Sequence, residues 1–488
     1  MSADTTEKKV TRAPRRRTPA YVKSLRGVKN WKQATEWLAW RDIEDIECIT
    51  PPDQAGVARG KMMPSKKFTS NTSLALPSAV FMTTISGDYP EDGYGFHYPE
   101  DDGDLKLMPD LSTLSAVPWE SDPTAQVICD LVYQDGRAVE FTPPRNVLRN
   151  VVAAYNKRGL KPVVAPPEIE FYLVRKNPPD PDYPLTPPVG RSGRAIGGGQ
   201  GYSIAGVNEF DELIDDIYHF SEGQGLEIDT LIHEEGAGQL EINLRHGDPV
   251  ELADQVFMFK RTIREAALKH DMYATFMAKP IQGQPGSAMH IHQSIVDKKT
   301  GRNIFTNEDG SESEAFRHFI GGMQRHVPNA LVMFAPYVNS YRRLTPDASA
   351  PVNVKWGYDN RTTAFRVPRS DPPNGRRVEN RIPPSSDANP PYLALAASLA
   401  CGLIGLVNKI EAEQPATTSV NTKEIDLPRG LIDAVELFEE DAELRNLFGS
   451  SFMTTYAAIK RAEFETFMEV ISRGNGSFCC SMFKGVRE

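Results

Sequence analysis

The sequence predicts a mixed α and β protein of two domains, in the α+β class. Its 488 residues are too many for one hydrophobic core. Segments with the two-residue alternation of strands are interspersed with segments of helical periodicity. The proline pair Pro143–Pro144 marks the boundary that we expect between the domains. We therefore predict a disordered basic tail at 1–30, a small N-terminal domain at 31–143 and a larger domain at 144–488.

Composition indicates which classes of protein this chain resembles and which partners it disfavours. Hydrophobic residues make up 40% and charged residues 25%, which is typical of a soluble globular protein. The net charge of −10 argues against a nucleic-acid partner. The 5 cysteines are scattered without metal-ligand spacing, as in a reducing compartment, so we expect a cytoplasmic protein. The basic start lacks the apolar stretch of a signal peptide, and no segment predicts a membrane span.

The first 143 residues contain one helix and two clear strands. Residues 1–30 carry Lys and Arg among Thr and Pro without periodicity, which favours a disordered arm. A helix is predicted over Trp31–Trp40, and apolar, partly alternating strands over Ile43–Ile49 and Val127–Tyr133. The second strand ends in the turn at Gln134-Asp135-Gly136.

The rest of the chain alternates helices and strands. We predict helices over Asn146–Lys157, Asp211–Glu222 and Pro249–His270, strands over Pro162–Leu173 and Gln239–Leu244, and a buried helix over Tyr392–Leu406. The stretch Gly190–Tyr202 is rich in glycine but has no Gly-Lys-Ser/Thr ending. It is therefore a flexible surface loop and not a phosphate-binding P-loop.

Two acids stand close together in Pro167-Glu168-Ile169-Glu170-Phe171. Side chains alternate along a strand, so Glu168 and Glu170 point to the same face. Two carboxylates on an otherwise apolar strand repel each other, and such a pair usually needs a cation or a proton. Edge strands also carry exposed pairs of this kind, so the pattern alone does not distinguish a cation site from an exposed edge strand.

Two further segments carry acids or histidines beside glycines. His233-Glu234-Glu235-Gly236-Ala237-Gly238-Gln239-Leu240-Glu241 is a turn that leads into a strand, and by itself it also fits a solvated hairpin. In Gly286-Ser287-Ala288-Met289-His290-Ile291-His292-Gln293-Ser294, the two histidines share a strand face. Alternating histidines next to glycine favour a metal or nucleotide site.

Arginines gather in the C-terminal half, where Arg377, Glu379 and Arg381 share one face of a predicted strand. Surface ion pairs explain arginine in the apolar strand Ala364–Pro368 poorly. Guanidinium groups match the oxygens of phosphates and carboxylates. Together with the acids and His290, they indicate metal ions that bridge phosphates, with arginine neutralising transferred charge.

In this order, these segments resemble the glutamine synthetase family. The shared motifs are Glu-x-Glu-Phe, Glu-x-x-x-Gly-Gln-x-Glu, Gly-Ser-x-Met-His-x-His, Asn-Ser-Tyr-Arg-Arg-Leu, Asn-Arg-Thr and Arg-x-Glu-x-Arg. The likeness extends upstream to Arg59-Gly60-Lys61 and covers roughly residues 40–470. It implies the glutamine synthetase fold, with a small β-grasp-like N-terminal domain and a large α/β catalytic domain. It also implies a homo-oligomer with sites between subunits, usually a dodecamer of two stacked hexameric rings.

The resemblance assigns roles to particular residues. One divalent cation, Mg²⁺ or Mn²⁺, is expected at Glu170, Glu234 and Glu241, and a second at Glu168, His290 and Glu379. Glutamate is expected at Gly286, Arg343 and Arg381. ATP is expected at His292, Ser294, Arg361, Arg366 and Arg377, with Arg361 and Arg381 also catalytic. ATP would convert the γ-carboxylate of L-glutamate to an acyl phosphate, which an amine then attacks.

Departures from the family pattern bear on the amine. Where glutamine synthetases carry a Glu that takes a proton from ammonium, this chain has Ser349. A second family acid is also missing, because its looser match, Phe81–Gly87, contains no Asp. Without both acids, the cage for ammonium is lost and space opens for a carbon substituent. Pro285, where the family has Asn before Gly-Ser, leaves a local ligand contact undecided.

These departures favour the γ-glutamylpolyamine synthetase branch, which glutamylates putrescine or longer polyamines for catabolism. A ligase for a monoamine such as methylamine, ethanolamine or isopropylamine is an open alternative. An ammonia-using glutamine synthetase is disfavoured by Ser349. A non-catalytic member of the fold is disfavoured because all six expected metal ligands are present.

Overall fold

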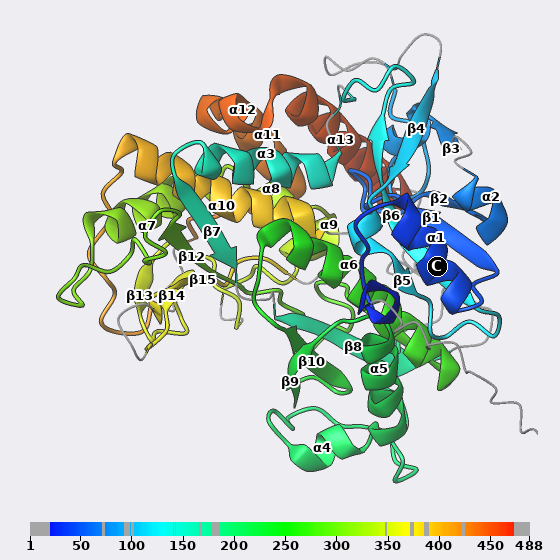
Figure 1. Cartoon of the computed structure of the whole chain (residues 1–488). Coiled ribbons are helices and arrows are strands. Elements are labelled where there is room, and N and C mark those ends of the chain that lie inside the picture. The colour runs from blue at the N-terminus through cyan, green and yellow to red at the C-terminus, as the bar shows by residue number, and fades with distance from the viewer. Residues whose placement is uncertain are drawn as a thin grey trace, which may run out of the picture.

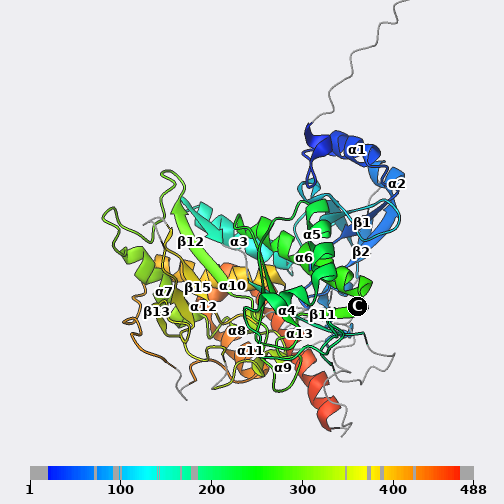
Figure 2. The same ribbon diagram turned by 90° about the horizontal axis from the view of Figure 1, so that it is seen from below.

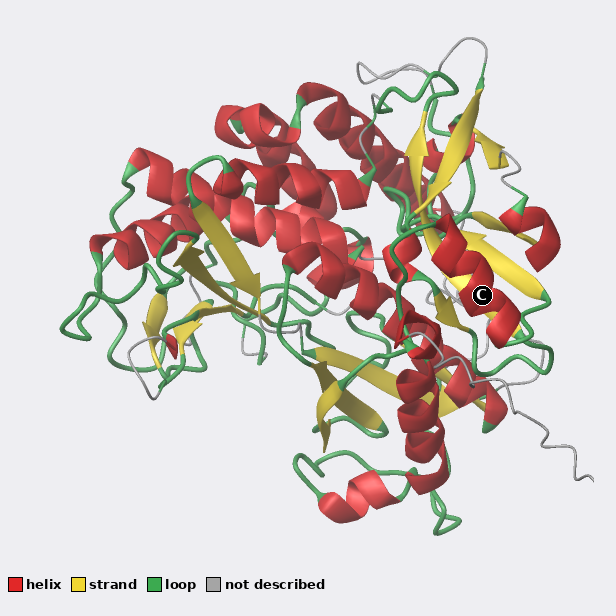
Figure 3. Cartoon of the chain, viewed as in Figure 1, coloured by secondary structure: helices red, strands yellow, loops and turns green. Residues whose placement is uncertain are grey.

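We describe the protein from a computed structural model of the whole chain (Figure 1). The structure describes residues 20–70, 74–91, 98, 102–139, 141, 143–164, 168–176, 185–346, 349–370, 375–384, 390–420 and 425–472. Within these residues, helices and strands are mixed along the chain, and the predicted α+β class is confirmed (Figure 3).

The N-terminal part of the chain builds one sheet, with strand order β2-β1-β6-β4-β3 and β5 paired to β6. Its strands are β1 Asp45–Ile49, β2 Gly60–Pro64, β3 Leu74–Pro77, β4 Asp104–Pro109, β5 Ser115–Ala116 and β6 Thr124–Val132. The predicted helix is present as α1 (Trp31–Trp40), because the Asn30 side chain caps it by accepting the Gln33 N–H. Short helices accompany the sheet: α2 Ser65–Thr69, and the 3-10 turns Ala20–Lys23, Ala79–Met82 and Leu111–Thr113.

Two further sheets follow in the chain. One has the order β11-β8-β10-β9 and the other the order β13-β14-β15-β12-β7. Their strands are β7 Leu160–Val164, β8 Ile169–Arg175, β9 Ile228–His233, β10 Gln239–Leu244, β11 Met272–Thr275, β12 Ile291–Asp297, β13 Trp356–Tyr358, β14 Phe365–Val367 and β15 Val378–Asn380. Strand β10 has the bounds that the sequence predicts.

Several helices of this part lie above the two later sheets in Figures 1 and 3, but α4 (Ile204–Asn208) lies below β9 and β10, and α5 (Asp211–Gly223) lies beside them. The helices of this part are α3 Pro144–Asn156, α4 Ile204–Asn208, α5 Asp211–Gly223, α6 Pro249–Lys269, α7 Glu314–His326, α8 Leu331–Phe334, α9 Val338–Tyr341, α10 Pro391–Asn408, α11 Leu431–Glu440, α12 Ala442–Phe448 and α13 Ser450–Ser472. Helix α6 begins where Asp248 accepts the N–H groups of Val250 and Glu251. Proline at its first position costs no hydrogen bond there.

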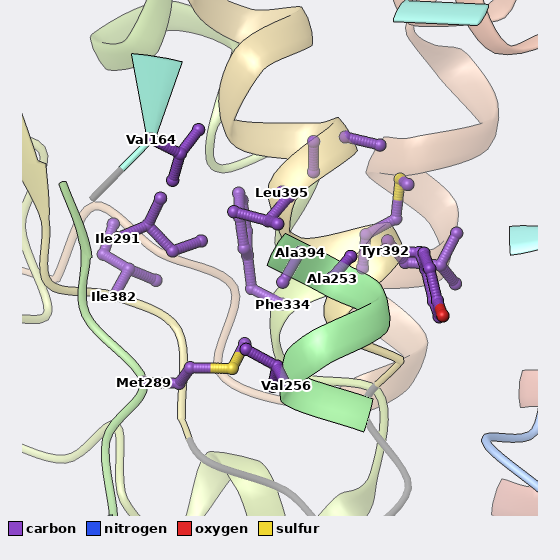
Figure 4. Close-up of a cluster of buried hydrophobic side chains, with 14 of the residues drawn as sticks. Val164, Ala253, Val256, Met289, Ile291, Phe334, Ile382, Tyr392, Ala394 and Leu395 are labelled. Atoms are coloured by element: carbon purple, nitrogen blue, oxygen red, sulfur yellow. The ribbon is translucent and has the colours of Figure 1, made fainter. Parts of the chain in front are cut away.

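Helix α10 is the centre of the main core. Its Tyr392, Ala394 and Leu395 pack with Phe334 and with side chains from α6 and β12 (Figure 4). The helix is long and apolar enough to cross a membrane, but 83% of its apolar window is buried inside the protein. It is therefore a core helix of the kind that is apolar on every side.

The described residues form two hydrophobic clusters. The larger joins α3, α6, α7 and α10 with the two later sheets, and the smaller lies between the N-terminal sheet and α1. Ala458 of α13 belongs to the smaller cluster, so the last helix reaches back to the N-terminal sheet. Figure 2 shows α1 and α2 at the far side of the molecule from α7 and β13. A division into domains at residue 143 stays a prediction.

Two expectations need correction. Residues 20–30 are not a disordered tail, because Val22 and Val28 are buried and the Gly27 N–H donates to Leu114 O; residues 1–19 lie outside the described part. The strand predicted over Pro162–Leu173 is two strands, β7 and β8, in different sheets. The proline pair Pro166–Pro167 explains the split, because proline has no N–H for a sheet ladder.

Candidate active site

The start of β8 lies against the segment that leads into β12, and this contact joins the two later sheets. The N–H groups of Glu168 and Glu170 donate to His290 O and Ala288 O, at 3.1 and 3.2 Å. The acids predicted on one strand face thus lie beside the predicted histidines. Glu168 and His290 are 122 positions apart in the sequence.

Three carboxylates meet in the first cluster, formed by Glu170, Glu234 and Glu241. Each offers an oxygen that lies within 4.8 Å of the others. Burial, together with the neighbouring carboxylates, raises the pKa of Glu170 to about 8 and that of Glu241 to about 9. Burial also raises the pKa of Glu234. Such a group is stable in its charged form only around a cation, so its chemistry fits Mg²⁺ or Mn²⁺, which prefer oxygen ligands.

In the second cluster, histidines lie against a carboxylate. Glu168 Oε2 lies 2.5 Å from His290 Nδ1, and its Oε1 lies 3.0 Å from His292 Nε2. Burial alone would raise the pKa of Glu168, but the two histidines hold it well below its usual range. Burial acts in the same way on Glu379, whose pKa is kept low by His290, His292 and Arg381.

The grouping in this cluster differs from the predicted one. Glu168, His292 and Glu379 are the residues whose ligand atoms lie within 4.8 Å of one another. His290 is still close, with its Nδ1 at 3.8 Å from Glu379 Oε1. His292 Nδ1 is 3.3 Å from the Nε of Arg377, which donates to it. The ligand sets for both cations stay predictions.

Buried arginines lie beside both clusters. Arg381 is 7% exposed, and its Nη1 is 3.6 Å from Glu379 Oε1. Within the described ranges, neither its Nε nor its Nη1 has a hydrogen-bond partner. Because buried N–H groups are normally paired, these two fit an anionic group of a substrate.

Arg343 and Gly286 come together, as predicted for one binding site. Arg343 Nη1 donates to Ile382 O at 2.9 Å, next to Arg381. A Cβ added at Gly286 would lie 2.8 Å from Arg343 Cγ and 2.7 Å from Ala278 O. Any other residue at position 286 would therefore displace the arginine or the backbone.

A cavity of about 620 Å³ opens beside the second cluster. Its lining includes the predicted Glu168, His292, Ser294 and Arg377. Arg366 lies behind Glu379, with its Nη1 2.8 Å from Glu379 Oε2 and its Nη2 2.6 Å from Asp359 Oδ1. Arg361 is exposed, and its charge acts on both Arg381 and Asp359.

Ser349 is exposed and lies just after residues 347–348, which are outside the described part. No contact in the described structure ties Ser349 to either cluster, so its effect on the amine stays a prediction.

Sequence reasoning missed several residues around the site. Asn243 lines the cavity and donates from Nδ2 to Glu241 Oε1 at 2.9 Å. Its position two residues after Glu241, on the same strand face, was the available signal. Gln239 was noted only as part of a motif, yet it bonds directly to Glu170. The other cavity residues that were not predicted are Val163, Asp229, Leu244, Arg245, His246, Gln293 and Gly375.

Comparisons with known proteins agree with this geometry. Residues 141–475 match the family described as glutamine synthetase, catalytic domain. The chain is 34% identical over 425 residues to the gamma-glutamylputrescine synthetase PuuA of Escherichia coli (strain K12), across 86% of this chain and 88% of that protein. It is 33% identical to a glutamate–isopropylamine ligase of Pseudomonas sp, across 84% and 89%. It is 36% identical to a glutamine synthetase of Pyrococcus horikoshii, across 77% and 82%.

A solved structure is also similar in fold. The structure titled "Apo GmaS without ligand" matches with a TM-score of 0.74 and 25% sequence identity, covering 89% of this chain and 96% of that one.

Proposed function

Because this chain belongs to the glutamine synthetase family and is a glutamate–amine ligase, we propose that it joins the γ-carboxylate of L-glutamate to putrescine or another polyamine, with hydrolysis of ATP to ADP. The observation that carries the proposal is the pair of carboxylate clusters beside Arg381, whose buried Nε and Nη1 have no hydrogen-bond partner in the described structure. A carboxylate is a poor electrophile, so a site that gathers phosphate, carboxylate and cations in one place suits its activation.

In this proposal, glutamate lies between Arg343 and Arg381, next to the backbone of Gly286. The free N–H groups of Arg381 bind a carboxylate, and the tight packing at Gly286 fixes the loop against Arg343. ATP occupies the cavity lined by His292, Ser294 and Arg377, and Arg366 supports the site through its bond to Glu379. Arg361, which is exposed near Arg381, neutralises charge on the transferred phosphoryl group.

Divalent cations at the two clusters, when bound, supply the positive charge that phosphoryl transfer to the γ-carboxylate requires. Arg343, Arg381 and the Gly286 loop then hold the acyl phosphate in a position where an amine can attack its carbonyl carbon. The attacking amine must be neutral, whereas free alkylamines have a pKa of roughly 10.4, similar to lysine. Burial of the amine among cationic groups favours the neutral form.

The identity of the amine rests on position 349. Ser349 carries no charge where ammonia-using relatives have an acid, which disfavours ammonium and leaves space for a carbon chain. A monoamine is the second candidate, favoured by the likeness to the glutamate–isopropylamine ligase at 33% identity. We also propose a homo-oligomer of stacked hexameric rings and a cytoplasmic location; light scattering on the purified protein tests the assembly.

Phosphate release across an amine panel tests the function. With glutamate, ATP and Mg²⁺, putrescine and spermidine should stimulate release more than ammonium does at matched concentration. Isopropylamine, methylamine and ethanolamine test the second candidate, a monoamine ligase. That candidate is correct if one of these three amines gives the highest kcat/KM. Equal or higher efficiency with ammonium would exclude both readings in favour of a glutamine synthetase.

A further inference from the structure

Gln239 connects the first carboxylate cluster to the loop at Gly286. Its Nε2 donates to Glu170 Oε2 at 3.1 Å and to Gly286 O at 3.2 Å. Its Oε1 accepts the N–H of Gly236 at 3.0 Å. The side chain is 1% exposed and uses both ends of its amide, so its orientation is fixed by its partners.

The surroundings hold this amide in one place. A Cβ at Gly236 would lie 2.6 Å from Gln239 Oε1 and 2.0 Å from the Tyr172 hydroxyl oxygen, so only glycine fits there. Tyr172 donates to Pro285 O at 2.8 Å. The loop is thus anchored at two successive carbonyls, one by Tyr172 and the next by Gln239.

Glu170 connects the first carboxylate cluster to Gln239. Its Oε2 accepts from Gln239 Nε2 and, at 2.7 Å, from Ala288 N–H. In the described structure no hydrogen bond falls on Oε1, which is therefore free to face a cation. A cation that fixes the Glu170 carboxylate also fixes the acceptor to which Gln239 is bonded, and hence the donor that holds Gly286 O.

We propose that Gln239 is a positioning residue that couples cation binding at the first cluster to glutamate binding at the Gly286 loop. This inference rests on the proposed function, because it takes glutamate to bind beside Gly286 and Arg343. The coupling is reciprocal, so a cation tightens glutamate binding by the factor by which glutamate tightens cation binding. Direct attraction between cation and glutamate supplies part of that factor, and the Gln239 bridge supplies the rest.

The test is glutamate binding by equilibrium dialysis, with and without Mg²⁺, in the full-length protein. The ratio of the two Kd values measures the coupling. Gln239→Met keeps the length of the side chain but removes its hydrogen bonds, and the ratio should fall by about fivefold or more. Electron paramagnetic resonance measures the affinity for Mn²⁺ with and without glutamate. The ratio of these two Mn²⁺ affinities should fall in Gln239→Met by the same factor as the ratio of the glutamate Kd values.

Two variants serve as controls. Gln54→Met makes the same change at a buried glutamine of the N-terminal part, bonded to Phe141 O, and should leave the ratio unchanged. Tyr172→Phe releases Pro285 O but spares Gln239, so it should weaken glutamate binding equally with and without Mg²⁺. Thermal melting confirms that each variant is folded.

The possible results distinguish a failure of the Gln239 proposal from a failure of the proposed ligase function. A wild-type ratio in folded Gln239→Met overturns the inference, as does an equal loss of coupling in Tyr172→Phe, which would assign the effect to the loop as a whole. If Gln239→Met does not fold, Gln239→Asn, which retracts the same amide, takes its place with the same expectation. Failure of the wild type to bind glutamate under any condition overturns the proposed function instead.

Discussion

Glu241 on β10 lies directly opposite Glu170 on β8 in the antiparallel register. Like charges in opposed positions destabilise a sheet, and here both carboxylates are buried. The sheet therefore brings together two groups that repel each other unless a proton or a cation lies between them. Glu234 joins them from the turn before β10.

This opposition predicts the effect of removing a ligand. Glu170→Ala and Glu379→Ala should each lower turnover by about two orders of magnitude or more, since even outer partners of metal ligands contribute about 10–100-fold. In Glu170→Ala the fold should persist, because the substitution removes a carboxylate that its neighbours repel. Glu379→Ala also removes the partner of Arg366, so thermal melting checks that this variant is folded. Steady-state phosphate release measures the effect, with exposed Glu212→Ala as the matched control. Wild-type turnover in both variants would exclude the proposed clusters as cation sites.

Ser349→Glu should improve the use of ammonium relative to putrescine. The carboxylate restores a charge that captures a cation and accepts its proton, and it fills space that a carbon substituent needs. The measurement is the ratio of kcat/KM for ammonium to that for putrescine, in wild type and variant. The shift should be modest, since the second family acid is missing too. An unchanged ratio in a folded variant that binds ATP would mean that position 349 does not select the amine.

Asp53 predicts a pH dependence of stability. Burial raises the pKa of this carboxyl to about 6, against 3.8 for an ordinary Asp, even though Arg59 lies 3.2 Å away. The folded protein thus keeps the proton up to about pH 6, while the unfolded chain loses it near pH 4. The stability that Asp53 contributes is present below about pH 4 and is lost as the pH rises to about 6, by about 3 kcal/mol at most.

Asp53→Asn cannot titrate, so it isolates this contribution. Between pH 4 and 6 the melting temperature of the wild type should fall relative to that of the variant, and the difference should level off above pH 6. Thermal melts in a pH series measure it. A difference that is constant, or that rises with pH, contradicts the raised pKa.

Arg145 joins the N-terminal sheet to helix α6, and we expect this link to contribute strongly to stability. Its guanidinium lies 2.8 Å from Asp110 Oδ2, 2.8 Å from Asp130 Oδ1 and 2.6 Å from Asp254 Oδ2, and the side chain is 2% exposed. Arg145→Met would leave the buried Asp254 without its ion-pair partner and should lower the free energy of unfolding by about 3–5 kcal/mol.

Arg149→Met is the matched control for this link. Arg149 pairs with the same Asp110 and Asp130, but its side chain is 36% exposed. Solvent screens such a pair, so its loss should cost about 1 kcal/mol or less. Denaturant unfolding of the two variants gives the comparison, and equal effects would mean that burial of Arg145 does not decide its contribution.

Local periodicity in the sequence predicted several of the helices and strands and the faces of the site strands. Alternation placed Glu168 with Glu170, and Arg377 with Glu379 and Arg381, because the side-chain period of a strand is fixed by its backbone. The uniformly apolar stretch within α10 predicted a buried helix. Six motifs in family order indicated the ligase before any contact between them was known.

Which of these residues meet depends on how distant segments pack together. The split of Pro162–Leu173 into two sheets, the opposition of Glu170 and Glu241, and the closeness of His292 to Glu168 and Glu379 depend on pairing between distant segments. Periodicity specifies the face of a strand but not its partner or its register. The role of Gln239 follows from such a pairing, since its amide reaches a carboxylate on a neighbouring strand and a carbonyl 47 positions away in the chain.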